Sequence, residues 1–374
     1  MVPEAIEAMA RELGRTGNAS SPHGSGRAAR RVVEEAREAI AGQVGAHPNE
    51  LIFTSGGTES DNLAVKGGYW SRADQGRTGI VTSAVEHHAV LDSVGWLAAA
   101  AGATASQLPV DATGRLEVSA LSSAVTPRTA VVSVMWANNE IGTLQPVAEV
   151  AERAAECGVL SHSDAVQAVG HVVFDFGRSG LDLATFTAHK LGGPYGVGAL
   201  LARREVGLTA VLHGGGQERE IRSGTLDVAA VAGFAAAVQM AARRLDQEEE
   251  RLRALRAELL DVVISCVPDA VPYGTMEAGA SLPGVIAIGF PGCQAESLLL
   301  LLDAAGIDCS AGSACSAGVT QPSHVLSAVG ASAEQARSVL RFSLGHTSTP
   351  ADVTAVAAAL PEAVRRARAA AGYA

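Results

Sequence analysis

The sequence has few of the features that mark disulfide-rich, zinc-binding or membrane proteins. Its 374 residues include only five cysteines, none in a C-x-x-C pair, and only 4% aromatic residues. We therefore expect neither a disulfide framework nor a structural zinc site. No apolar run reaches about 18 residues, and the N-terminus lacks a charged segment followed by an apolar one. These absences predict a soluble protein of the cytoplasm.

Basic residues are too few and too scattered to indicate a polyanionic partner. The net charge is −11, and the adjacent pairs Arg30-Arg31 and Arg203-Arg204 are isolated from each other. Nucleic acids and anionic membranes are bound by clustered Lys and Arg. We therefore expect no nucleic acid and no membrane among the partners.

The apolar residues alternate between strand and helix patterns along most of the chain. Strand-like runs lie at residues 51–54, 80–82, 129–136, 183–187 and 197–201, and helical stripes at 27–44, 87–101 and 147–155. This rhythm predicts an α/β fold with a mainly parallel sheet between helices. A charged helix at 247–256 indicates a domain boundary near Asp246. We expect a large domain at 13–246 and a smaller α+β domain made of 1–12 and 247–374.

Lys190 is the most informative residue of the chain. It follows the strand-like run 183–187 and enters the Gly-rich turn 191–196, where backbone and small residues would partly shield it. Desolvation favours a neutral, nucleophilic amine that can form a Schiff base with an aldehyde cofactor. Asp164 and Gln167 follow another predicted strand. A lysine and a strand-end aspartate are what pyridoxal phosphate needs, as covalent partner and as counter-ion of the ring nitrogen.

Further polar segments follow the predicted strands, where open parallel sheets bind ligands. They are 55–61 with Thr58, 86–88 with His87, 136–142 with two asparagines, the Gly-rich loop 213–225, and 309–318 with Cys309 and Cys315. Each also has an ordinary interpretation, such as a helix cap, a surface loop, or a packed turn in which cysteine acts as a small apolar residue.

Taken together, the motifs resemble those of the cysteine desulfurases, in the same order and from about Gly17 to the C-terminus. They are Gly57–Asn62, Glu86-His87, Asn138–Gly142, Asp164-x-x-Gln167, His189-Lys190, Arg222–Thr225, Gly312–Cys315 and Arg341–Gly345. The resemblance implies a fold type I pyridoxal-phosphate transferase of the class-V aminotransferases, and a homodimer. The spacing from Gly312 to Gly330 resembles the group with a long catalytic cysteine loop.

The resemblance also assigns site residues. Lys190 would bind the cofactor covalently and remove the Cα proton of the substrate, Cys315 would be the nucleophile, and His87 would stack on the cofactor ring. Asp164 would pair with the ring nitrogen. The remaining cofactor contacts would come from Gln167, Gly57, Thr58, Asn139, Thr187, His189 and, from the other subunit, Thr225. Arg341, aided by Asn139, would bind the substrate carboxylate.

The implied reaction converts L-cysteine to L-alanine and leaves a persulfide on Cys315, which passes sulfur to an acceptor protein. No resident metal is expected, although Cys315 could transiently ligate an iron–sulfur cluster. Two alternatives share the same lysine and aspartate. One is a related class-V lyase or aminotransferase acting on selenocysteine or cysteine sulfinate. The other is a sulfur-relay scaffold without turnover.

The sequence departs from the family pattern at two places. Family members usually begin with a strand reading roughly Tyr-Leu-Asp-Asn-Ala-Ala-Thr-Thr-Pro, and this sequence starts just after that point. Either the start of the sequence was misassigned, or the chain lacks the wall that this strand adds to the substrate pocket; in both cases we expect the cofactor site to be present. Cys309 stands where other members often have serine, which offers a second thiol near Cys315.

Overall fold

The structure, a computed structural model, describes residues 1–311, 315–316, 319–320 and 322–373, with no side chains described between 312 and 321. It divides into two compact units. Unit 1 comprises residues 1–108, 117–137 and 145–245, and unit 2 comprises 109–116, 138–144 and 246–374.

The division differs from the expected domains in two respects. Residues 1–12 lie in unit 1, because Val2 is buried there and its N–H donates to the carbonyl of Gly192. The loops 109–116 and 138–144 lie in unit 2. The second loop is bound there through the carbonyl of Gly142, which accepts the N–H of Leu282. Asn139 is therefore a residue of unit 2.

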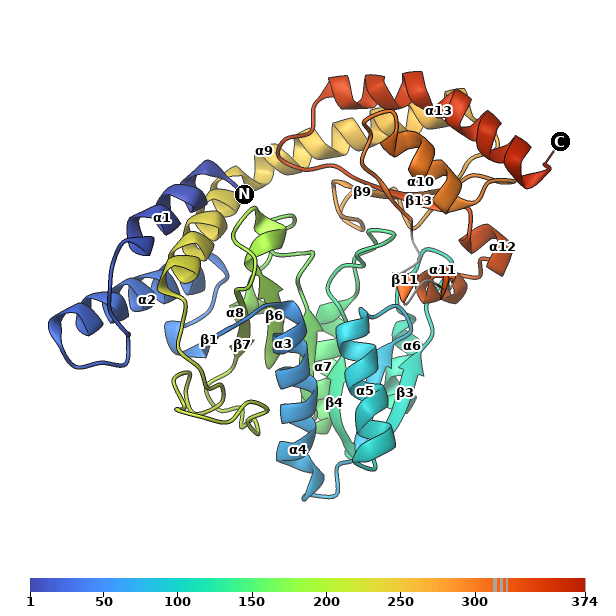
Figure 1. Cartoon of the computed structure of the whole chain (residues 1–374). Coiled ribbons are helices and arrows are strands. Elements are labelled where there is room, and N and C mark those ends of the chain that lie inside the picture. Colours follow the sequence, from blue (N-terminus) through green and yellow to red (C-terminus); the bar gives the residue numbers. More distant parts are fainter. Residues whose placement is uncertain (312–314, 317–318, 321, 374) are drawn as a thin grey trace. The chain divides into compact units, whose positions relative to one another are not determined.

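Unit 1 is built on a seven-stranded sheet. In spatial order its strands are β1 (Leu51–Thr54), β7 (Gly198–Ala202), β6 (Leu183–Thr187), β5 (Leu160–Asp164), β4 (Thr129–Ser133), β2 (Gly79–Ser83) and β3 (Thr104–Leu108). Of these, β1, β7, β6, β4 and β3 are labelled in Figure 1. The strands from β6 to β3 are parallel, and β7 is antiparallel to both of its neighbours. The predicted α/β fold with a mainly parallel sheet is confirmed.

Helices cover both faces of this sheet. They are α1 (Pro3–Leu13), α2 (Gly24–Gln43), α3 (Gly57–Asn62), α4 (Gly68–Ala73), α5 (His88–Ala100), α6 (Val118–Ala124), α7 (Val147–Cys157) and α8 (Phe176–Ser179), with a π-helical turn, η2 (Leu63–Gly67), between α3 and α4. One face packs against Leu63, Tyr69 and Val94 of the α3–α5 segment. On the other, Phe186 of β6 meets Phe234 with ring centroids 5.4 Å apart.

Phe234 belongs to α9 (Val228–Cys266), which runs 39 residues from unit 1 into unit 2. Among the described residues it is the one helix long and apolar enough, by composition, to cross a membrane. In the apolar window 44% of the residues are buried inside the protein, and Phe234 is fully buried. The helix therefore has the character of a core helix. The charged segment 247–256 is its middle part.

Unit 2 contains an antiparallel four-stranded sheet. Its strands in spatial order are β10 (Ser310–Ala311), β13 (Val339–Ser343), β9 (Val285–Gly289) and β8 (Val271–Tyr273). Its helices besides α9 are α10 (Ala295–Asp303), α11 (His324–Ala328), α12 (Ala333–Ala336) and α13 (Pro350–Ala371). A short hairpin pairs β11 (Cys315–Ser316) with β12 (Val319–Thr320).

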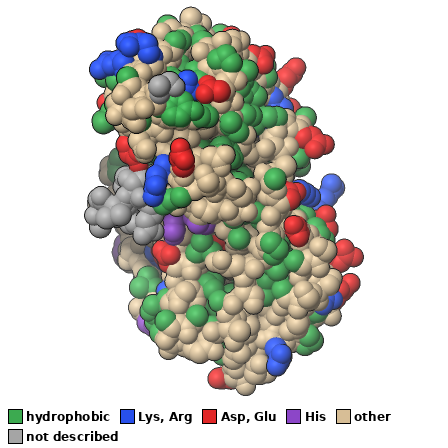
Figure 2. Space-filling view, turned by 90° about the vertical axis from the view of Figure 1, so that its right-hand side faces the viewer, with side chains coloured by type: hydrophobic (Ala, Val, Ile, Leu, Met, Phe, Trp, Pro, Cys, Tyr) green, Lys and Arg blue, Asp and Glu red, His purple; other side chains and the backbone are tan. Residues whose placement is uncertain are grey.

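The charged side chains are spread over the surface. On the face drawn in Figure 2, Lys and Arg side chains of the described residues stand among acidic and hydrophobic ones and form no continuous stripe. The described residues of this face therefore form no continuous basic surface, in a chain whose net charge is −11.

Candidate active site

The candidate site of unit 1 begins where β5 ends. Asp164 is the last residue of this strand and is only 5% exposed. Its Oδ1 accepts the N–H of Val166 at 2.9 Å. Burial raises the pKa of Asp164, while the Val166 N–H and the charges of His87 and Lys190 act in the opposite direction. Gln167 is half-buried in the turn that follows. Two predicted cofactor residues thus follow the same strand.

His87 lies near Asp164, in the segment that joins β2 to α5. It is the N-cap of α5, and its Nδ1 accepts the N–H of Ala89 at 3.1 Å, which leaves the proton of a neutral ring on Nε2. The ring is exposed. A ring nitrogen of His87 and one carboxylate oxygen each of Asp164 and Asp61 all lie within 4.8 Å of one another. The sequence indicated His87 and Asp164, but gave Asp61 no role, although it lies in the motif 57–62.

Lys190 lies in a 3-10 turn, η3 (Ala188–Leu191), directly after β6. Its side chain is exposed, so the expected shielding by backbone and small residues is wrong. The turn itself is held in place, because the carbonyl of Lys190 accepts a hydrogen bond from His171 Nε2 at 3.0 Å. Thr187 is buried, and its hydroxyl donates to the carbonyl of Val197 and lies 3.1 Å from His189 Nδ1. Thr187, His189 and Lys190 thus come together at the end of β6.

A glycine contact shapes the neighbouring start of α3. Gly56 precedes this helix with φ 152°, and a Cβ on Gly198 of β7 would lie 2.7 Å from the Cα of Gly56. A glycine at position 198 is therefore needed for the two backbones to approach this closely, whereas Gly56 is favoured by its positive φ. Gly57 begins the helix, and Thr58 is exposed in its first turn. The predicted phosphate residues Gly57 and Thr58 therefore lie at a helix start that no side chain of β7 obstructs.

The Gly-rich loop with Thr225 is anchored at a buried point. Glu218 accepts hydrogen bonds from Arg37 at 2.7 and 2.9 Å and from the N–H of Phe53 at 2.8 Å. Arg222 of the same loop forms an ion pair with Glu59 at 2.8 Å. Thr225 itself is exposed. The loop therefore joins α2, β1 and α3 by specific bonds.

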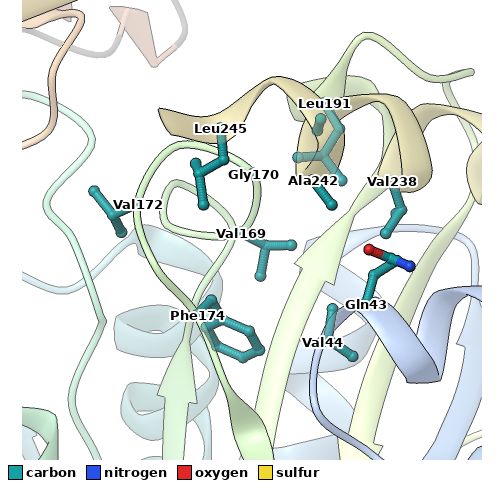
Figure 3. Close-up of a pocket in the computed structure, with 11 residues that line it drawn as sticks. Gln43, Val44, Val169, Gly170, Val172, Phe174, Leu191, Val238, Ala242 and Leu245 are labelled. Atoms are coloured by element: carbon teal, nitrogen blue, oxygen red, sulfur yellow. The ribbon is translucent and has the colours of Figure 1, made fainter. Parts of the chain in front are cut away.

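A small apolar pocket lies beside the Lys190 turn. Figure 3 shows Leu191, Val169 and Phe174 among its lining side chains, with Gln43 as the only polar one. Such a lining cannot bind a phosphate or a substrate carboxylate. We therefore exclude this pocket from the candidate site.

Unit 2 carries the predicted carboxylate-binding residue. Arg341 lies on β13, and its Nη1 donates to the backbone carbonyl of Asn139 at 2.9 Å. Its Nε is buried without a hydrogen-bond partner among the described residues. A buried, unsatisfied donor of this kind suits a carboxylate ligand. The neighbouring Asn138 has a different role, because its Oδ1 accepts the N–H groups of Glu140 and Ile141 and so stabilises the loop.

The two cysteines of the predicted catalytic segment differ. The backbone of Cys315 lies in β11, but its side chain and residues 312–314 lie outside the described part of the chain. Cys309 is half-buried and packs against the apolar core of unit 2. Burial, with Asp308 and Asp303 adding to it, raises the pKa of Cys309 to about 11. Cys309 therefore has the character of a packing residue, because the thiolate is the reactive form.

Comparisons with known proteins agree with these features. The profile of the aminotransferase class-V family matches residues 1–356. The chain is 55% identical to an IscS-like cysteine desulfurase of Mycobacterium tuberculosis, over 99% of this chain and 95% of that protein. It is 42% identical to the cysteine desulfurase IscS of Dictyoglomus turgidum, over 90% and 84%. A solved NifS-like protein superposes with a TM-score of 0.89 at 32% identity, covering 100% of this chain and 97% of that one.

Proposed function

Because this chain belongs to the class-V aminotransferase family and is a cysteine desulfurase, we propose that the residues after β5, β6 and β2 hold pyridoxal phosphate and act on L-cysteine. Members of this family are pyridoxal-phosphate enzymes. The observation that carries the proposal is the buried carboxyl group of Asp164 at the end of β5. Burial raises its pKa, and the charges of His87 and Lys190 act to lower it.

The donor set fits this cofactor. A buried carboxylate suits a ring nitrogen that must stay protonated, and an exposed amine on the neighbouring strand end suits an aldehyde carbon. His87 presents an exposed ring whose orientation is fixed by its bond to Ala89. For the phosphate we propose Gly57, Thr58, Thr187 and His189, with Thr225 from a second copy of the chain. We assign Gln167 to the phenolic oxygen.

When bound, pyridoxal phosphate withdraws electrons from the substrate α-carbon and so acidifies its C–H bond. Lys190 Nζ takes up that proton. Arg341 binds the substrate carboxylate through donors that include its buried Nε. Asn139 aids it by holding Nη1 with its backbone carbonyl.

Cys315 completes the reaction as a thiolate. Its sulfur forms a bond with the substrate sulfur as the bond from that sulfur to Cβ breaks. The electron pair left on the carbon fragment takes up protons, which gives L-alanine, and the enzyme keeps a persulfide. We propose that an acceptor protein receives this sulfur by thiol exchange, and that the enzyme works as a homodimer.

The reaction is tested by incubating the purified chain with pyridoxal phosphate, L-cysteine and a thiol reductant. We expect sulfide and alanine in equal amounts, and loss of both in Lys190→Ala and Cys315→Ala. Cys309→Ala is the matched control and should keep turnover, because its thiol is packed in the core of unit 2. Alanine formation that survives Cys315→Ala would instead favour a lyase without a cysteine nucleophile.

Cofactor binding is tested separately by visible absorption. Wild-type protein titrated with pyridoxal phosphate should gain a visible band that Lys190→Ala lacks. Asp164→Asn should bind the cofactor roughly tenfold to a hundredfold more weakly, because it removes a charge-assisted hydrogen bond. Equal affinity of Asp164→Asn and wild type would contradict the proposed place of the ring nitrogen.

A further inference from the structure

A second buried carboxyl group, that of Asp61, lies next to Asp164. Asp61 of α3 is 1% exposed. One of its carboxylate oxygens lies within 4.8 Å of a carboxylate oxygen of Asp164 and of a ring nitrogen of His87. Its Oδ1 has no hydrogen-bond partner among the described residues. The nearest basic group to this oxygen is His162 Nε2, at 3.7 Å. A buried, unpaired carboxylate oxygen is costly, so the protonation of Asp61 needs an explanation.

His162 cannot balance a negative charge on Asp61. The ring is fully buried on β5, and burial lowers the pKa of His162 to about 3. Its Nδ1 lies 2.8 Å from the hydroxyl of Ser133, and its Nε2 lies 3.1 Å from that of Thr185. Both ring nitrogens thus have neutral partners. Thr185 also hydrogen-bonds to the carboxyl of Asp61, which acts to lower the pKa of Asp61, but neither Thr185 nor His162 brings a positive charge to it.

The charged groups on the other sides favour Asp164 as the ionised member. His87 from α5 and Lys190 from η3 both lower the pKa of Asp164, and Asp164 accepts a backbone N–H. Burial and then the charge of Asp164 raise the pKa of Asp61 well above its ordinary value, and Glu86 adds to the effect. Burial also raises the pKa of Glu86, to about 8. Two buried carboxyl groups this close favour a state in which one is ionised and the other is protonated.

We propose that Asp61 is a positioning residue that stays protonated in the folded protein, so that Asp164 is the single ionised carboxylate at the end of β5. A neutral Asp61 leaves one negative charge, rather than two, opposite the cofactor ring nitrogen. This consequence rests on the proposed binding of pyridoxal phosphate, whereas the protonation of Asp61 does not. Glu86, hydrogen-bonded to Ser83 and to the N–H of Met135, adds to the raised pKa of Asp61 and is assigned no role at the cofactor ring.

The test is infrared spectroscopy of the full chain carrying ¹³C in the aspartate side-chain carboxyl groups. At about pH 7 ordinary aspartates are ionised. We expect a protonated aspartic acid band in wild-type protein, with and without pyridoxal phosphate. The band should vanish in Asp61→Asn and remain in Asp164→Asn. Glu86 does not interfere, because its carboxyl group carries no label.

Two outcomes would overturn the proposal. They are the absence of a protonated band in wild-type protein and a band that persists in Asp61→Asn, which would point to Asp164 if Asp164→Asn lacked it. The absence of the band in wild-type protein overturns the proposal even if a variant fails to fold, whereas a band that is present is assigned by Asp61→Asn. As a second readout, Asp61→Asn should keep the visible cofactor spectrum and its pH profile, because a neutral amide replaces a neutral acid. A protein that binds no cofactor but shows the band would refute the proposed cofactor site alone.

Discussion

The buried ion pair between Arg37 and Glu218 should contribute strongly to the free energy of unfolding of unit 1. Arg37 lies on α2 and Glu218 in the Gly-rich loop, with side chains 10% and 2% exposed. Glu218 accepts two bonds from the guanidinium and one from the N–H of Phe53. The guanidinium also lies over the Phe53 ring, 4.8 Å from its centroid. Glu218→Ala would leave Arg37 Nη2 and the buried N–H of Phe53 without their acceptor, while Arg37 Nη1 keeps the carbonyl of Leu51.

We expect Glu218→Ala to lower the free energy of unfolding by about 3–5 kcal/mol, the usual cost of removing one partner of a buried pair. Arg37 offers its own control, because Glu34 also contacts it at 3.1 Å from a side chain that is 45% exposed. Glu34→Ala removes a solvent-screened partner and should cost less than about 1 kcal/mol. Burial, rather than pairing alone, therefore sets the difference.

Tryptophan fluorescence during urea unfolding reports the loss of stability in unit 1, where the ion pair lies. The three tryptophans, Trp70, Trp96 and Trp136, all belong to unit 1. Wild type, Glu218→Ala and Glu34→Ala are compared at equal protein concentration without cofactor. Should Glu218→Ala lose no more stability than Glu34→Ala, the buried pair is not an anchor of the loop and the reasoning fails.

Other expectations follow from single groups. The pKa of Glu86 is raised to about 8 in the fold, against ~4.3 when unfolded. Its stabilising effect is therefore full below pH ~4.3 and lost as the pH rises through about 8, so urea midpoints of wild type should fall relative to Glu86→Gln over that range. Gly198→Ala would force a Cβ to 2.7 Å from Gly56 and should weaken cofactor binding in an absorption titration, whereas Gly207→Ala, with no atom near its Cβ, should not. With its pKa near 11, Cys309 should resist iodoacetamide in the native protein and react only in urea, as mass spectrometry would show; equal labelling in both would contradict its burial.

Much of unit 1 could be predicted from the sequence because its strands are short, apolar and regularly spaced. The runs 51–54 and 183–187 coincide with β1 and β6. Asp164 and Lys190 were found because a polar residue directly after a buried strand is a local signal. The antiparallel insertion of β7 had no such signal, because pairing partners in a sheet depend on contacts between distant segments.

Contacts between distant positions account for what the sequence did not reveal. Glu218 and Arg37 are 181 residues apart, and the Gly-rich sequence around Glu218 does not reveal which distant residue pairs with it. Asp61 approaches Asp164 because α3 packs against β6 and β7, and β6 is the neighbour of β5 in the sheet. The exposure of Lys190 was predicted wrongly, since a Gly-rich turn can shield a side chain or leave it open, depending on its fold.

The first residues of the chain have a practical importance for anyone preparing the protein. Val2 is buried and its N–H donates, at 2.7 Å, to the carbonyl of Gly192, two residues beyond Lys190. An affinity tag fused before Met1 would emerge beside the turn that carries the reactive amine. A tag after α13 would follow Tyr373, which is 48% exposed and belongs to unit 2. Purification handles therefore belong at the carboxyl end.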